Sequence, residues 1–173
     1  MSTRVILLEK LAKMISEGVD LDNVQALPLQ INKRVTFNYN GNEFGVVIEK
    51  IGSENINIFP KILSPPLNLK GYYNFGFDFE TTTIRIEKKS YRELAVPLAI
   101  IVKSLLEWIE KNNPIFISIF ADSKDVEELN KKINLYSALL DREKPKLTNM
   151  GYYWDYFNSP KYGKSIYIKK ITN

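Results

Sequence analysis

The sequence of 173 residues contains no cysteine and no histidine. Without cysteine the chain cannot form a disulfide, a thiolate nucleophile or a cysteine-ligated zinc site. Without histidine it lacks the side chain that most often serves as general base and as metal ligand at neutral pH. We therefore predict no metal site, and catalysis would have to use carboxylate, tyrosine, lysine or hydroxyl groups.

A membrane-spanning run is also missing from the sequence. The longest strongly apolar segment, residues 94–106, is interrupted by Lys103 and is too short to cross a bilayer. Residues 1–20 carry charges within their apolar part and have no small-residue cleavage site, so they do not resemble a signal peptide. These features predict a soluble protein of the cytoplasm, or of the host cytoplasm or the virion if a phage encodes it.

The charge is small but unevenly placed. The net charge is +4, and the segment from Arg142 to the end holds seven Lys or Arg residues against two acidic ones. Such a basic end can contact phosphates or an acidic partner, so nucleic acid is one predicted ligand. The length, with 45% hydrophobic residues, predicts a single domain over residues 1–173. An N-terminal helix and loop would occupy residues 1–32, and the core residues 33–173.

The first half of the chain shows mainly strand patterns. An amphipathic helix is predicted at residues 4–17, followed by strands at 34–39 and 43–51 joined by a hairpin turn at Asn40-Gly41. Another strand is expected at 55–63. Residues 73–79 alternate strictly, with aromatic side chains on one face, and residues 82–88 continue as strand.

The second half alternates helices with strands. A capping box formed by Ser90 and Glu93 opens a long helix to about residue 111. A continuous apolar run at 115–121 predicts a central strand covered on both faces, and a second long helix follows at 124–141. The chain then ends in two strands joined by a turn at 158–163. This order predicts an α/β fold of the mixed-sheet α+β type, with helices on both faces of the sheet.

The order of elements resembles the GNAT acyltransferase architecture over residues 33–171. In that family an antiparallel meander leads into a helix–strand–helix crossover and a C-terminal strand pair. A local pattern adds to the resemblance: a helix ends in Leu-Tyr at Tyr136, and Met150-Gly151-Tyr152 opens the following strand. Small phage and bacterial proteins with a GNAT-like topology are similar in the same loose sense.

The resemblance implies an acyl-CoA-dependent N-acyltransferase, with acetyl-CoA as cofactor and Tyr136 as general acid. A carboxylate at Asp78 or Glu80 would be the base. The family binds the cofactor pyrophosphate with a glycine-rich loop, whereas residues 86–95 here contain no glycine. Positive charge is nevertheless supplied there by three residues that would be the cofactor-binding set: Lys88, Lys89 and Arg92. The residues themselves favour another interpretation of Tyr136, as a core tyrosine at an inward helix position.

The last candidate is the aromatic stretch at residues 151–164. Alternation predicts that Tyr152, Trp154 and Tyr156 pack on a helix. The four residues then predicted to form a contact surface are Tyr153, Phe157, Lys161 and Lys164. Because the cofactor loop departs from the family pattern, the leading hypothesis is a GNAT-like protein without normal catalysis. It would act through contacts with a protein partner or with copies of itself, for instance as a phage virion or accessory component.

Overall fold

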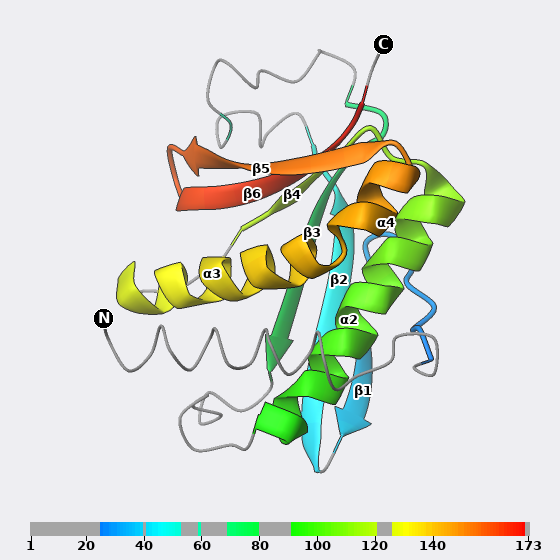
Figure 1. The fold of residues 1–173 in the computed structure, drawn as a ribbon, viewed down its shortest axis with the longest axis vertical. Coiled ribbons are helices and arrows are strands. Elements are labelled where there is room, and N and C mark those ends of the chain that lie inside the picture. Colours follow the sequence, from blue (N-terminus) through cyan, green and yellow to red (C-terminus); the bar gives the residue numbers. More distant parts are fainter. Residues whose placement is uncertain are drawn as a thin grey trace.

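The computed structural model describes residues 25–39, 41–52, 59, 69–79, 91–120 and 126–171. These residues form a mixed α/β fold in which helices pack against a six-stranded sheet (Figure 1). The elements are β1 (Val35–Tyr39), β2 (Asn42–Lys50), β3 (Tyr72–Phe79), α2 (Tyr91–Asn112), β4 (Phe116–Ile119), α3 (Val126–Arg142), α4 (Lys144–Asn149), β5 (Tyr152–Ser159) and β6 (Gly163–Lys170).

The strand order across the sheet is β1-β2-β3-β4-β6-β5. β1, β2 and β3 are antiparallel neighbours, and the turn between β1 and β2 places Gly41 at a φ of 78°, which a glycine adopts at little cost. Helix α2 crosses over so that β3 and β4 run parallel. β6 then pairs antiparallel with β4 and with β5, which leaves β1 and β5 at the two edges of the described sheet.

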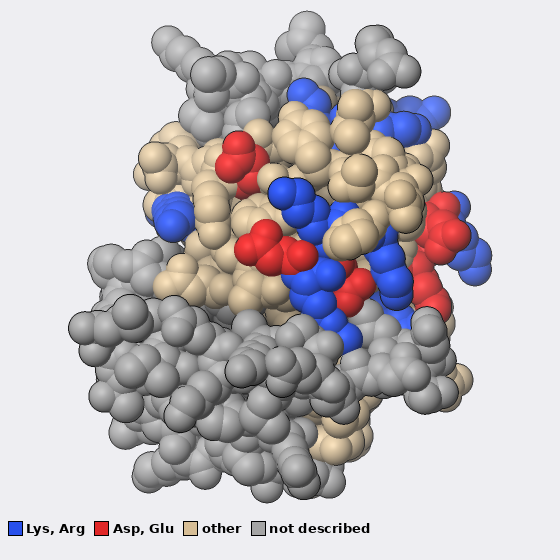
Figure 2. All heavy atoms as spheres, viewed as in Figure 1, with Lys and Arg blue, Asp and Glu red and all other residues tan. Residues whose placement is uncertain are grey.

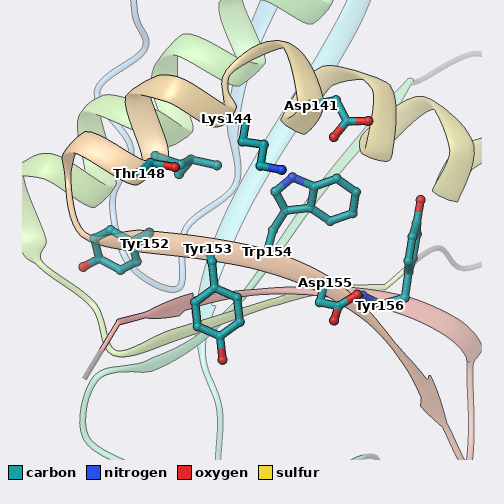
Figure 3. A pocket seen from close by; sticks show the side chains of 9 residues that line it. Asp141, Lys144, Thr148, Tyr152, Tyr153, Trp154, Asp155 and Tyr156 are labelled. Atoms are coloured by element: carbon teal, nitrogen blue, oxygen red, sulfur yellow. The ribbon is translucent and has the colours of Figure 1, made fainter. Parts of the chain in front are cut away.

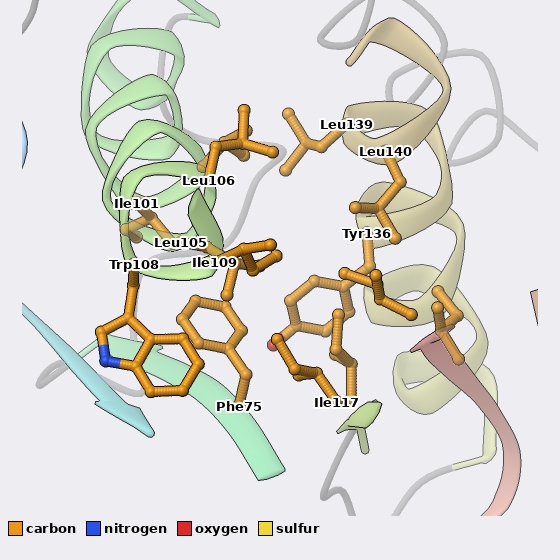
Figure 4. Packing of buried hydrophobic residues seen from close by; sticks show 14 of the residues in the cluster. Phe75, Ile101, Leu105, Leu106, Trp108, Ile109, Ile117, Tyr136, Leu139 and Leu140 are labelled. Atoms are coloured by element: carbon orange, nitrogen blue, oxygen red, sulfur yellow. The ribbon is translucent and has the colours of Figure 1, made fainter. Parts of the chain in front are cut away.

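One face of the sheet carries the main apolar core and all three described helices. The aromatic row predicted on β3 is confirmed there: Tyr73 packs edge-on against Trp108 of α2, with 4.8 Å between ring centroids, and Phe75 is buried. Figure 4 shows side chains of α2 and α3, among them Leu106 and Leu139, meeting above Phe75. The core therefore sits between the sheet and these two helices.

The opposite face, which no described helix covers, has a smaller core of its own. Its buried members are Ile51, Phe59, Phe116 and Phe157. The ring of Phe59 lies 5.9 Å from that of Phe157 and 5.6 Å from that of Phe116. Every residue of β4 is consequently buried, which confirms the prediction of a strand covered on both faces.

Several expectations differ from the structure or fall outside it. Helices were predicted on both faces of the sheet, but the described helices all lie on one face. The helix predicted at residues 4–17 lies outside the described residues. The same is true of the strand predicted at 82–88, and of the strand at 55–63 except for Phe59, which lies in a bend. Helix α4 was not predicted; it begins at Lys144-Pro145, where proline suits a first helical turn.

Candidate functional site

The residues that the resemblance assigns to an acyltransferase site are only partly described. Asp78 is placed by its backbone on β3, opposite Gly45 of β2, and Arg92 by its backbone in the first turn of α2. The side chains of these two residues lie outside the described part of the chain, as do Glu80, Lys88 and Lys89 entirely. Their proposed roles stay predictions.

Tyr136, the candidate general acid, is a buried residue of α3. Its side chain is 6% exposed and belongs to the main core between α2 and α3. The ring packs edge-on against Phe77 of β3, with 4.8 Å between centroids. This position matches the structural alternative predicted for an inward helix tyrosine, and its role as an acid stays a prediction.

The predicted contact surface is partly wrong. Tyr153 is 41% exposed and Lys161 and Lys164 are exposed, as expected, but Phe157 is only 7% exposed. Alternation does place Phe157 on the face away from the helices. That face is not open to solvent, because the smaller aromatic core covers it. Phe157 is thus a core residue, and the four residues do not form one continuous patch.

Strand β5 is the feature that these side chains share. Its one strand neighbour in the described sheet is β6, with pairs from Tyr152↔Lys170 to Ser159↔Gly163. The backbone N–H of Tyr156 donates to the carboxylate of its neighbour Asp155 at 2.7 Å, so it points away from β6. Because hydrogen-bonding direction alternates along an antiparallel strand, the N–H groups of Trp154 and Asn158 point outward as well. β5 therefore presents a row of outward amides at a sheet edge.

A pocket of about 240 Å³ opens beside this edge, on the face that carries the helices (Figure 3). The row Tyr152, Trp154 and Tyr156 of β5 forms one wall. The opposite wall comes from the end of α3 and from α4, including Asp141 and Lys144. Figure 3 shows the Trp154 ring between the α3–α4 connection and β5, with Tyr153 pointing to the other side of the strand.

Two aromatic side chains of this wall are held in place by neighbours. The Tyr156 hydroxyl donates to Oγ of Ser137 at 2.7 Å, and Ser137 donates to the Ile133 carbonyl of the same helix. The Trp154 ring packs edge-on against the Tyr156 ring at 5.3 Å. Tyr156 nevertheless remains 39% exposed, and Lys164 Nζ lies 4.3 Å from its ring centroid. The wall is thus ordered and accessible, and the tyrosine ring already accommodates a cation.

On the other face of β5, three polar side chains lie together. The rings of Tyr153 and Tyr167 meet edge-on at 6.0 Å. Burial raises the pKa of Tyr167 to about 12, with additional contributions from Tyr153, from the negative charge of Asp155 and from a side-chain hydrogen bond with Tyr153. Asp155 pairs with Tyr167 across the β5–β6 ladder, so its exposed side chain lies on the same face as the two rings.

The charges around the site are of both signs. At the α3–α4 junction, Glu143 is buried and its carboxylate lies 3.3 Å from Nε of Arg142 and 3.9 Å from Nζ of Lys146. Figure 2 likewise shows lysine and arginine side chains interspersed with acidic ones on the face viewed, without gathering by sign. The described residues on this face therefore form no continuous positive surface that would support the predicted contact of the basic end with phosphates.

Two further properties follow from the described residues. They contain no group of three or more carboxylates placed to hold a metal ion. Within the same part of the chain, none of the helices combines the length and apolar character needed to cross a membrane.

No protein-family model matches the sequence, and no curated protein or solved structure is similar enough to count as a match. The geometry of the β5 edge is therefore the basis for the function proposed below. Trp154, Asp141 and Lys144 were missed as site residues, and Tyr156 was predicted to be packed.

Proposed function

We propose that this chain is a GNAT-like protein without ordinary acyltransferase chemistry, and that it acts by binding a protein partner along β5. The observation that carries the proposal is the edge itself: outward amides at Trp154, Tyr156 and Asn158 lie beside exposed aromatic rings and a pocket. An extended segment that pairs with such an edge gains main-chain hydrogen bonds, while pockets for alternate side chains supply specificity. β5 offers both.

The size of the pocket favours a side chain over a small-molecule ligand. Its volume of about 240 Å³ is below the roughly 300–1,000 Å³ typical of ligand sites. Trp154 and Tyr156 are also the residue types most enriched where proteins bind one another, because they bury a large area with few rotatable bonds. The pocket therefore suits one residue of an added strand.

Photo-crosslinking tests the proposal in cells that naturally make the protein. A photoreactive benzoyl-phenylalanine at Tyr153, on β5, is expected to give a discrete crosslinked product with another protein. The same group at Thr36 is the matched control, because Thr36 is exposed on β1 at the far edge of the sheet. Asn158→Pro should abolish the product, since proline removes an outward N–H without removing a bond to β6.

The control for that substitution is Asn158→Ala, which keeps the backbone N–H and should keep the product. Equal products from Tyr153 and Thr36, or a product from Tyr153 that survives Asn158→Pro, would show that the partner does not pair with β5.

The acyl-CoA-dependent N-acyltransferase remains a second candidate, and the order of the strands favours it. An antiparallel meander followed by a parallel β3–β4 pair and a C-terminal hairpin is the order that the GNAT resemblance implies. Under our main proposal, calorimetry with acetyl-CoA at high micromolar concentration is expected to give no binding heat. Binding heat that weakens when Lys88, Lys89 and Arg92 are changed together to alanine would instead favour the acyltransferase.

A further inference from the structure

Asp155 is the acidic residue of the edge strand β5, and its position has consequences for the partner. Its exposed carboxylate accepts the outward N–H of Tyr156 at 2.7 Å, so it occupies one of the donors that an added strand would need. Among the described residues no lysine or arginine forms an ion pair with it. The carboxylate thus protects the edge in the free protein.

We infer that the segment added to β5 belongs to a different protein and carries a lysine or arginine that lies beside Asp155; this rests on the proposed function. When the segment pairs with β5, its carbonyl oxygen takes over the Tyr156 N–H. The Asp155 carboxylate then loses that hydrogen bond and becomes available to a donor on the added strand. A basic side chain on the same face of the added strand supplies that donor and the opposite charge.

A second copy of this chain is the occupant that the geometry disfavours. Two β5 strands paired antiparallel about a two-fold axis would be centred on residue 155 or 156 if seven of the eight residues of β5 are to pair. Centring on 155 places the two Asp155 side chains directly opposite, about 4.5–5.5 Å apart at Cβ, and centring on 156 places them on a diagonal at about 7–8 Å. Like charges at these separations on one face oppose pairing.

The surroundings of Asp155 suit a basic side chain for a second reason. Tyr153 and Tyr167 lie on the same face of the hairpin, with their rings 6.0 Å apart. A tyrosine ring attracts a cation near its face, and this hairpin already shows that arrangement where Lys164 lies over Tyr156. A guanidinium or ammonium group beside Asp155 would therefore contact both a carboxylate and an aromatic surface.

The residues that flank the basic one face the pocket on the helix side. Side chains alternate along an added strand, so the neighbours of the basic residue point toward Trp154 and Tyr156. The pocket there also includes the buried side chain of Leu147. The partner segment is thus expected to be extended and to contain a basic residue with an apolar residue on each side.

Selection from a library of displayed random peptides tests the inference. The full chain, Asp155→Lys and Asn158→Pro serve as targets, after circular dichroism and thermal unfolding show that each is folded. Peptides selected on the unchanged protein are expected to carry Lys or Arg between apolar residues, and Asp155→Lys should select Asp or Glu at that position. A peptide from the first selection should bind Asp155→Lys roughly tenfold more weakly.

The outcomes separate the inference from the function on which it rests. Peptides that fail on Asn158→Pro yet show no charge preference, or the same preference with Asp155→Lys, would overturn the inference and leave strand addition standing. The absence of any peptide sensitive to Asn158→Pro would overturn both. A dimer of the unchanged protein that Asn158→Pro dissociates in sedimentation equilibrium would also overturn the inference, because the occupant would then be a second copy.

Discussion

Phe157→Ala is expected to lower the free energy of unfolding by about 3–5 kcal/mol, the usual cost of deleting a buried phenylalanine. The Phe157 side chain is 7% exposed and its ring lies within 6.0 Å of the rings of Phe59, Phe120 and Tyr167. Alanine would leave a cavity in the small core around Phe59, because rings held on three sides cannot all collapse into it. Chemical denaturation monitored by circular dichroism measures the change.

The matched control is Tyr153→Ala, which removes a ring of similar size from the same face of β5. Tyr153 is 41% exposed and contacts Tyr167, so its loss is expected to cost about 1 kcal/mol or less. Similar losses for the two variants would contradict the separation of β5 into a core position and a contact position.

Tyr152→Phe is expected to cost about 1–3 kcal/mol at neutral pH, the penalty for leaving a buried polar group without its partner. The side chain is 2% exposed, and its hydroxyl donates to the carbonyl of Pro114 at 2.6 Å. Oδ1 of Asn113 lies 3.2 Å from the same hydroxyl and accepts from Lys170 at 2.8 Å. This contact joins the start of β5 to the connection between α2 and β4, so the substitution removes a link between distant parts of the chain.

The same substitution should change how stability depends on pH. Burial raises the pKa of Tyr152 to about 12, compared with about 10 in the unfolded chain. The raised pKa means that the folded state favours the protonated hydroxyl. The contribution of this hydroxyl to the free energy of unfolding is complete below pH 10. It is lost as the pH rises from 10 to 12, at no more than about 1.4 kcal/mol per pH unit.

Tyr167, whose pKa is also raised to about 12, contributes in the same direction and remains in the variant. Urea unfolding at pH 9, 10 and 11 should therefore show a shallower loss of stability for Tyr152→Phe than for the unchanged protein. An equal or steeper loss of stability in the variant would show that the buried Tyr152 hydroxyl is not a source of this pH dependence.

Local patterns in the sequence predicted most of the fold. The alternation of residues 73–79 corresponds to β3, the Asn40-Gly41 turn joins β1 to β2, and the apolar run at 115–121 corresponds to β4. Such patterns are reliable because side-chain period and turn chemistry act over a few residues. Helix α4 escaped prediction because six residues are too few to establish a helical period.

The candidate site was less predictable. Alternation separated the Tyr152, Trp154, Tyr156 row from the Tyr153, Asp155, Phe157 row, and this division is correct. It could not tell which member of each row is covered, since Tyr156 is 39% exposed in the row predicted to pack and Phe157 is buried in the other. Phe157 is covered by Phe59, almost one hundred residues earlier in the chain. No local pattern carries that information.

The amino-acid sequence was sufficient to exclude cysteine and histidine chemistry, to place most of the described helices and strands, and to separate the two faces of the β5–β6 hairpin. The fold was needed to show that β6 lies between β4 and β5, and that β5 is therefore an edge of the described sheet, with outward amides. It also brought α4 against that edge and so formed the pocket at Trp154. Periodicity and turn preference are local properties of the sequence, whereas strand order and burial depend on contacts between residues far apart in the chain.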